Sequence, residues 1–346
     1  MTQLSIYDAL YASPVVFAAG FIVTRVLTPK IIELHRKKGI VRPDAHKPGK
    51  PLVAHSGGVV LAIAFTLSIV VAFTLMGPAA YDLVVRLSAI LLSGLICFLI
   101  GLYDDIKILG GKEKTLLTLL AIAPIIGLHM VYPDIIVLGR PVVPLIGRIR
   151  LTIIYWIILP LAVAGPANLV NMLDVYNGVT PGMMLVATAA LAATSFILGS
   201  PLLLIFASAL GGVLLSYYPY NAYPARIFNG DSGSLFLGAL LGALAVVGRI
   251  EFLVMTLLLL HIINGIMILV SFGGFKEHRE IGRRPVIVKD SLLVASRDPE
   301  APWSLTRLIL LIGGPAREYE LSRLYILLET LPAALAVITA ILMRWP

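Results

Sequence analysis

Long runs of apolar side chains recur along almost the whole chain, and they restrict the folds available to it more than any other feature. A helix that crosses a lipid bilayer needs about twenty mostly apolar residues. Ten runs approach this length, although the fifth and sixth are short and have polar edges. We therefore predict membrane-spanning helices near residues 6–27, 57–76, 84–103, 115–132, 151–167, 181–198, 201–218, 232–248, 252–272 and 322–343.

The composition agrees with an all-α integral membrane protein that forms a single polytopic domain over residues 1–346. Hydrophobic residues make up 59% of the chain and charged residues 13%, whereas soluble domains have about 25% charged residues. The single cysteine, Cys97, lies in an apolar run, so neither a disulfide framework nor a cysteine-based metal site is available. The first apolar run has no basic segment before it and no small-residue cleavage site after it, so we interpret it as a retained helix.

The distribution of lysine and arginine predicts the orientation in the membrane. Under the positive-inside rule, the loops that follow the first, third, fifth, seventh and ninth predicted helices face the cytoplasm. Both termini then face outward. The cytoplasmic loops lie near residues 28–56, 104–114, 168–180, 219–231 and 273–321. Three arginines at 140–150 are the exception, in a segment (133–150) that we expect to form a small outer hairpin. The net charge of +8 fits loops beside anionic lipid, so we expect no nucleic-acid partner.

Four amide or carboxylate side chains follow the fifth apolar run. Asn168, Asn171 and Asp174 lie three residues apart, and Asn177 and Gly178 come next. On a helix, this spacing places side chains on one side. The alternative to a functional site is a set of hydrogen bonds between helices. Because buried polar groups are costly in lipid and four occur in one run, we favour a functional site.

Further polar motifs fall in the other loops of the predicted cytoplasmic face. Asp104 and Asp105 end the third predicted helix, and Lys114 begins the next. Adjacent carboxylates repel each other and are tolerated where a cation or a proton lies between them, although such a pair can also be a solvated helix end. Asp231 follows an Asn-Gly turn and could bind a divalent cation or cap a helix. Phe228 is available to stack on a base.

The first and last predicted cytoplasmic loops add charged residues. Asp44 and Lys47 lie in the first, and a cluster that includes His278, Arg279 and Arg283 lies in the last. Such a cluster could clamp a diphosphate through bidentate arginine contacts, or it could serve the positive-inside rule alone. The sequence has no zinc-type spacing, G-x-S-x-G motif or P-loop. Hard oxygen ligands suit Mg²⁺ that bridges phosphates, which indicates phosphoryl transfer involving a lipid.

At these residues the sequence resembles the polyprenyl-phosphate N-acetylhexosamine-1-phosphate transferases, of the glycosyltransferase family 4 type. The resemblance runs from about residue 44 to 285. Asp104-Asp105 and Lys114 resemble the family's Asp-Asp motif and the lysine beyond it. Residues 168–178 resemble its Asn-x-x-Asn-x-x-Asp-Gly-x-Asp/Asn-Gly motif. Residues 224–231 are very similar to the segment of the eukaryotic branch, the dolichyl-phosphate GlcNAc-1-phosphate transferases.

The resemblance implies ten helices and a cytoplasmic active site in the cell membrane. It implies transfer of an N-acetylhexosamine 1-phosphate, with GlcNAc favoured, from a UDP-sugar to dolichyl or undecaprenyl phosphate, releasing UMP and initiating lipid-linked glycan synthesis. Mg²⁺, or alternatively Mn²⁺, would be the cofactor; whether the enzyme is a homodimer stays open. The implied metal ligands are Asn171 and Asp231, the uracil contacts Asn177 and Phe228, the further substrate contacts Asp44, Lys47, Asn168, Asp174, His278 and Arg279, and the catalytic residues Asp104, Asp105 and Lys114. Which aspartate acts on the lipid phosphate stays open.

Three departures from the family pattern bear on the substrate. Val175 replaces a glycine that is usual in the bacterial motif, and His55 stands where the eukaryotic enzymes have an acid. His278-Arg279 is closer to the Arg-His-Arg of GlcNAc-type enzymes than to the histidine-rich motif of the muropeptide branch. This argues against a MurNAc-pentapeptide substrate, and the compact last loop favours a prokaryotic member, such as an archaeal one.

A transporter or flippase for a phosphorylated or lipid-linked sugar is the alternative function. Its polar residues would line a pathway at mid-helix, and its halves would be related by internal symmetry. The polar motifs of this chain instead lie at the predicted cytoplasmic helix ends, without a recurring period.

Overall fold

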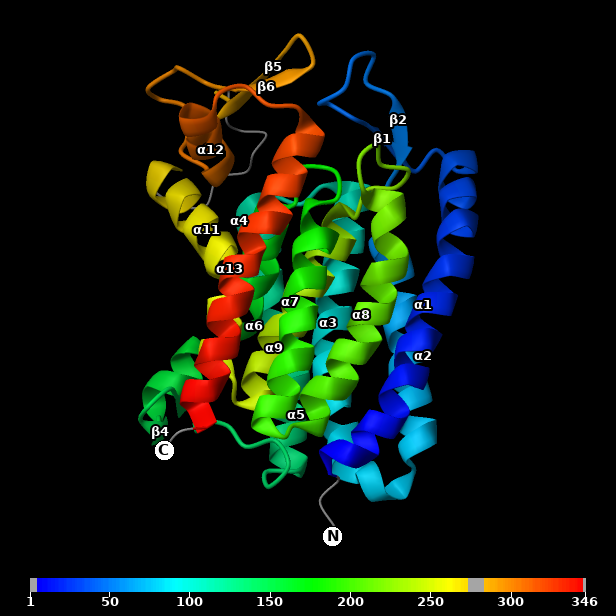
Figure 1. Ribbon diagram of the computed structural model, residues 1–346, viewed down its shortest axis with the longest axis vertical. Coiled ribbons are helices and arrows are strands. Elements are labelled where there is room, and N and C mark those ends of the chain that lie inside the picture. Colours follow the sequence, from blue (N-terminus) through cyan, green and yellow to red (C-terminus); the bar gives the residue numbers. More distant parts are fainter. Residues whose placement is uncertain (1–4, 273–282, 345–346) are drawn as a thin grey trace.

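The computed structural model describes residues 5–272 and 283–344, and it shows a bundle of long helices with both chain ends at the same end of the bundle (Figure 1). Within these residues, nine helices are long and apolar enough to cross a membrane, or ten if one bent pair counts as a single span. The prediction of an all-α, multi-pass membrane protein with about ten spans is therefore confirmed. The side of the membrane that each end faces stays a prediction.

The spanning segments agree with the apolar runs, and short strands and one further helix connect them. The helices and 3-10 turns are α1 (Ile6–Lys37), α2 (Gly58–Met76), η1 (Pro78–Ala80), α3 (Tyr81–Lys107), α4 (Gly111–Thr118), η2 (Leu119–Ile122), α5 (Ala123–Val131), α6 (Ile153–Leu173), α7 (Val179–Leu198), α8 (Pro201–Asn221), α9 (Gly230–Gly248), α10 (Glu251–Leu257), α11 (Leu259–Phe272), α12 (Leu305–Gly313) and α13 (Glu318–Arg344). The strands are β1 (Val41–Pro43), β2 (Leu52–Ala54), β3 (Val142–Val143), β4 (Gly147–Arg148), β5 (Val286–Lys289) and β6 (Leu292–Ala295).

Helix α9 lies at the centre of the bundle and packs against α2, α3 and α6. Of its best 18-residue window, 89% is buried. Glycines allow the neighbouring backbones to come close to it. A Cβ added at Gly58 of α2 would lie 2.4 Å from the Gly233 nitrogen, and one at Gly101 of α3 would lie 2.3 Å from the Asp231 carbonyl oxygen. Small residues at helix contacts of this kind are typical of membrane proteins.

Two predicted spans are interrupted. The run at 115–132 begins as α4 and continues through η2 into α5, where Pro124 lies in the first turn and cannot donate a helical hydrogen bond. The run at 252–272 breaks at Leu258 into α10 and α11, which are bent by 73°. No proline or glycine marks this second break. Asn264 of α11 accepts a hydrogen bond from the Leu305 amide, so we attribute the bend to tertiary contacts.

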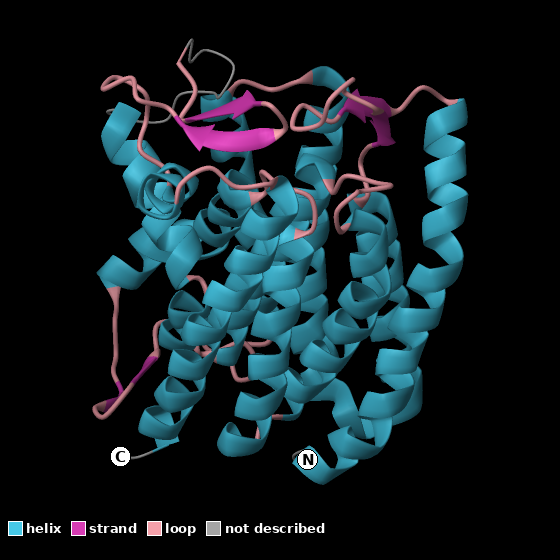
Figure 2. Ribbon diagram, turned by 45° about the horizontal axis from the view of Figure 1, so that its top comes forward, coloured by secondary structure: helices cyan, strands magenta, loops and turns pink. Residues whose placement is uncertain are grey.

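Three antiparallel hairpins lie outside the helices. The expected hairpin within residues 133–150 is confirmed as β3–β4. The first loop forms β1–β2. The last loop, expected only as a connection over 273–321, contains β5–β6 and the amphipathic helix α12. Figure 2 shows β1–β2 and β5–β6 above the same end of the bundle, so they cover the helix ends there.

We expect Gly101→Ala to destabilise the protein, because the new methyl group would collide with the α9 backbone at Asp231. Overpacking of this kind costs about 1–3 kcal/mol. Gly127→Ala, in α5, meets open space and should be neutral or stabilise by about 0.5–1 kcal/mol. Thermal unfolding of both purified variants in one detergent tests the close approach, and equal midpoints would contradict it.

Candidate active site

A large pocket opens at the hairpin-covered end of the bundle. Its volume is about 1310 Å³. It takes lining residues from all five segments predicted to face the cytoplasm, including the β1–β2 loop, the ends of α3 and α6, and the start of α9. Most of the polar residues singled out from the sequence are therefore neighbours, although they come from distant parts of the chain.

The start of α9 is held by a carboxylate from another helix. Asp105, at the end of α3 and only 8% exposed, accepts hydrogen bonds from the Asp231 amide at 2.7 Å and from the Ser232 hydroxyl at 2.6 Å. His55 lies 3.3 Å from the same carboxylate. A carboxylate at a helix N-terminus is favoured by the free N–H groups and the helix dipole. Asp105 is thus turned toward the protein interior and does not line the pocket.

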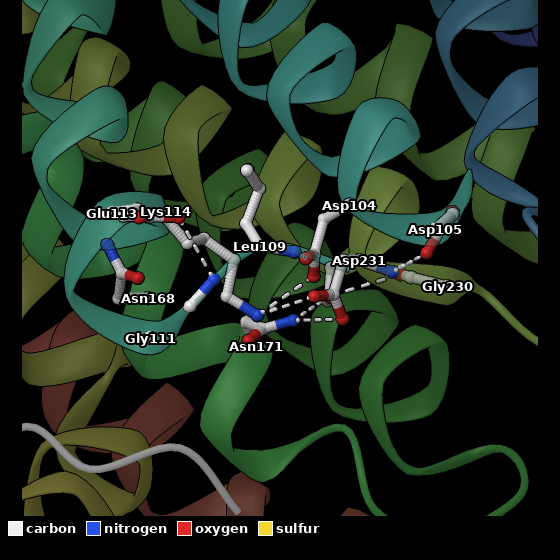
Figure 3. A network of polar contacts seen from close by, with 12 residues as sticks. Asp104, Asp105, Leu109, Gly111, Glu113, Lys114, Asn168, Asn171, Gly230 and Asp231 are labelled. Carbon is white, nitrogen blue, oxygen red and sulfur yellow. Dashed lines mark hydrogen bonds and ion pairs between the residues drawn. The ribbon is translucent and has the colours of Figure 1, made fainter. Parts of the chain in front are cut away.

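Asp104 points into the pocket instead, where it meets a lysine and a second aspartate (Figure 3). The Lys114 ammonium lies 3.2 Å from the Asp104 carboxylate and 2.5 Å from that of Asp231. Asn171, in the last turn of α6, donates hydrogen bonds to Asp231 at 2.9 Å and to the Ser234 hydroxyl at 2.8 Å. The three charged groups and the amide therefore form one cluster at the junction of α3, α4, α6 and α9.

The charge of this cluster suits a divalent cation. Asp174, just past the end of α6, accepts a hydrogen bond from Asn229 at 2.8 Å. Burial, together with the charge of Asp231, raises the pKa of Asp174 to about 6. Asp104 and Asp231 against the Lys114 ammonium leave one negative charge in excess, and the neighbouring Asp174 adds a second. The donors are hard oxygens, so these residues fit Mg²⁺, which Asp231 and Asn171 could hold.

A second polar cluster lies at the pocket and includes the lining residues Asp44, Lys47 and Asn177. The Asn177 side chain donates to Asp44 at 3.0 Å, and its backbone amide donates to Glu318 at 2.9 Å. Lys47 donates to Asp44 and lies 3.6 Å from Glu318. Burial opposes ionisation of Asp44, but the hydrogen bonds from Lys47 and Asn177 outweigh it, so the pKa of Asp44 lies below its ordinary value. The four residues close a ring that ties the first loop, the α6–α7 loop and α13 together.

Asp44, His46 and Glu318 also lie close enough together to hold a metal ion. The Lys47 ammonium already binds Asp44 and lies beside Glu318. Two carboxylates against this one ammonium leave a single negative charge, whereas Asp104, Asp231 and the neighbouring Asp174 leave two against Lys114. The Lys47 ammonium repels a cation, and the smaller negative charge attracts it less, so a divalent cation is less favoured here.

Two further predicted site residues lie at the pocket in different ways. Asn168 lines it, but its amide is bound to the Thr118 hydroxyl and the Ala164 carbonyl, both at 2.8 Å. Asn168 thus joins α6 to α4. Phe228 is half-buried, and its backbone is bonded to Ala54 and Gly57. The fixed ring of Phe228 therefore forms part of the pocket wall. His278 and Arg279 fall outside the described residues.

Sequence reasoning missed several residues that shape the pocket. Glu318 is 4% exposed at the start of α13, and no local pattern distinguishes it from the exposed Glu320 two residues on. Asn221, at the end of α8, accepts a hydrogen bond from the Gly178 amide and donates to the Ile227 carbonyl. Both act on partners far away in the sequence. A polar side chain at the end of an apolar run is the one local signal that could have drawn attention to Asn221.

Comparison with known proteins agrees with the resemblance seen in the sequence. Residues 87–249 match the family described as Glycosyl transferase family 4. A protein of Sulfolobus acidocaldarius, provisionally named a UDP-N-acetylglucosamine–dolichyl-phosphate N-acetylglucosaminephosphotransferase, is 31% identical over 339 residues, which cover 92% of this chain and 93% of that protein. A Saccharolobus solfataricus protein with the same provisional name is 30% identical over 332 residues, which cover 93% of this chain and 94% of that protein. A phospho-N-acetylmuramoyl-pentapeptide-transferase of Clostridium novyi is 28% identical over 285 residues, which cover 79% of this chain and 83% of that protein.

The matched segment spans α3 to α9 and so includes the Asp231 cluster. Because a 31% identical relative also aligns over most of both chains, this chain is a membrane-embedded enzyme of glycosyl transferase family 4.

Proposed function

We propose that the enzyme transfers N-acetylglucosamine 1-phosphate from UDP-N-acetylglucosamine to a polyprenyl phosphate and releases UMP. One observation carries the proposal: a single pocket is lined by the cluster of Asp104, Lys114, Asp231 and Asn171 and also by Asn177 and Phe228. Acids, amides and a lysine suit phosphoryl transfer between two phosphates.

The uridine end of the donor fits the wall between Phe228 and Asn177. Phe228 offers an aromatic face on which uracil can stack. The ring of Asp44, Lys47, Glu318 and Asn177 would hold the loops that carry Asn177, and Lys47 would supply a positive charge near the donor phosphates. The donor would therefore bind with its diphosphate directed toward Lys114 and Asp231.

The transfer itself needs positioning and charge compensation more than proton transfer. An oxygen of the lipid phosphate attacks the phosphorus attached to the sugar, and the bond from that phosphorus to the oxygen shared with the uridylyl phosphate breaks. Lys114 supplies a positive charge to the reacting phosphates, while Asp104 holds the ammonium at 3.2 Å and faces the acceptor. Mg²⁺ held by Asp231 and Asn171 would neutralise the diphosphate and the leaving UMP.

The acceptor fits the less polar flank of the pocket. Met172, Ile268, Leu269 and Trp303 line this flank. Ile268 and Leu269 belong to α11, which bends away from α10 by 73°. An isoprenoid chain could thus lie along α11 and bring its phosphate to Asp104. This arrangement favours a transferase over a transporter, because the polar groups cluster at one end of the bundle.

GlcNAc is proposed as the sugar on the provisional names of the archaeal relatives. The direct test supplies the purified enzyme with UDP-GlcNAc, a polyprenyl phosphate and Mg²⁺, and then measures UMP release and the mass of the lipid product. UDP-MurNAc-pentapeptide serves as the competing donor. A lipid product from the muropeptide donor alone would refute the proposed substrate.

Asp231→Asn should abolish turnover while the protein stays folded, because the proposed cation loses a charged oxygen ligand. UMP release at limiting Mg²⁺ and the thermal unfolding midpoint are the two measurements. Asp134→Asn, an exposed change between α5 and the β3–β4 hairpin, is the matched control and should have no effect. UMP release close to wild type at limiting Mg²⁺ would remove Asp231 from the metal site.

Phe228→Ala should weaken binding of the UDP-sugar more than binding of the lipid phosphate. Stacking on a base contributes about 1–3 kcal/mol, so the KM for the donor should rise roughly fivefold to a hundredfold. Phe196→Ala removes a ring that is 53% exposed on α7 and should change neither KM. Equal losses for the two substrates would exclude Phe228 from the uridine pocket.

Glu318→Gln should raise the KM for the UDP-sugar about tenfold, equivalent to about 1.4 kcal/mol, with a smaller change in kcat. Glutamine can still accept from the Asn177 amide but no longer attracts Lys47. Glu318→Ala should cost more, because it also leaves the buried Asn177 N–H unbonded. Glu320→Gln, two residues along and exposed, is the control. A Glu318→Gln enzyme with wild-type KM would show that the Lys47 contact is dispensable.

A further inference from the structure

Three arginines that contradict the positive-inside pattern, Arg140, Arg148 and Arg150, lie in or beside the β3–β4 hairpin. Figure 1 shows this hairpin at the end of the bundle opposite to β1–β2 and β5–β6. The strands pair Val142 with Arg148, and two more backbone hydrogen bonds continue the same register outward. Residues that face each other, and those two positions further along, share a face of an antiparallel pair. Arg140, Arg148 and Arg150 therefore project from the same side.

Two arginines of the helical bundle add to this group. Arg249 lies in the turn between α9 and α10, and α10 packs against β3. Burial and the positive charges of Arg148, Arg86 and Arg140 lower the pKa of the Arg249 guanidinium. Arg86 is half-buried in the second turn of α3, and its Nε is buried with no hydrogen-bond partner among the residues that the structure describes. A buried donor of this kind calls for a ligand or a water.

Asp82, one turn before Arg86 on α3, attracts that arginine. In the described part of the chain, no ion pair includes any of these arginines. Glu251 attracts Arg249 but also accepts a hydrogen bond from Tyr155 at 3.0 Å. Arg249 itself has φ of +55°, in the left-handed region where glycine is usual after a helix. The arginines are thus close together despite their mutual repulsion, and Arg249 adopts a backbone conformation that a non-glycine residue disfavours. Such strained positions are common at binding sites.

We propose that Arg86, Arg140, Arg148 and Arg249 form a binding site for a phosphate group, supplied by the headgroup of an anionic membrane lipid. Guanidinium groups bind phosphate oxygens through paired hydrogen bonds, and several of them around one phosphate cancel their mutual repulsion. The hairpin connects two spanning helices, α5 and α6, so the site lies where the membrane headgroups begin. It shares no residue with the pocket and is independent of the proposed function.

The test compares the wild-type enzyme with the triple variant Arg140→Gln, Arg148→Gln, Arg249→Gln in a neutral detergent. The probes are phosphatidylglycerol, phosphatidylcholine and inorganic phosphate, the last against chloride at equal ionic strength. Native mass spectrometry counts bound lipids, and thermal unfolding measures stability. The control variant is Lys30→Gln, Arg36→Gln, Lys38→Gln. It removes the same charge from exposed positions near the C-terminal end of α1, at the other end of the bundle.

We expect wild type and the control to bind phosphatidylglycerol at least tenfold more tightly than the triple variant does, and to prefer it to phosphatidylcholine. Without anionic lipid, the triple variant should be as stable as wild type or more so, since repulsion is relieved. Stabilisation by inorganic phosphate as well would assign the site to the phosphate group alone, and stabilisation by phosphatidylglycerol only would assign it to the lipid. Equal lipid binding by all three proteins, or a triple variant that is less stable in neutral detergent, would overturn the proposal.

Discussion

The hydrogen bonds from the start of α9 to the Asp105 carboxylate fix the geometry on which the pocket depends. The cluster of Asp104, Lys114, Asp231 and Asn171 takes residues from both helices, so it would shift if α9 moved along α3. The approach is possible because Gly101 leaves room for the α9 backbone, where any Cβ would lie 2.3 Å from the Asp231 carbonyl oxygen. One aspartate of the Asp104-Asp105 pair thus holds the helix in place, and the other is left to face the pocket. Adjacent carboxylates are tolerated because they point to different partners.

The two clusters of the pocket differ in charge, and this difference suggests how a diphosphate donor would be oriented. Around Asp231, the carboxylates of Asp104, Asp231 and the neighbouring Asp174 exceed the Lys114 ammonium by two charges, which matches one divalent cation. Around Glu318, two carboxylates share Lys47, and the amide of Asn177 closes the ring. The first arrangement suits the proposed metal-assisted transfer, and the second suits rigid support of the loops proposed to bind the uracil base. The apolar flank formed by α11 leaves a separate approach for a lipid.

The opposite end of the bundle has its own organisation. Arginines from the β3–β4 hairpin, α3 and the α9–α10 turn gather there with few acids near them. The positive-inside rule counts charges in loops and takes no account of their arrangement, so it registers these arginines only as exceptions. Once folded, they become one positively charged surface, whose natural complement is an anion at the membrane boundary.

The sequence by itself determined the membrane-spanning architecture, because the length and hydropathy of a run are local properties that a bilayer selects directly. It also predicted that residues 168–178, 224–231 and the Asp104-Asp105 pair would share one face. Only the tertiary structure decided which aspartate faces the pocket, that Glu318 supports Asn177, and that α10 and α11 bend at Leu258. Each of these depends on partners far apart in the chain, so no spacing or composition within a segment encodes it.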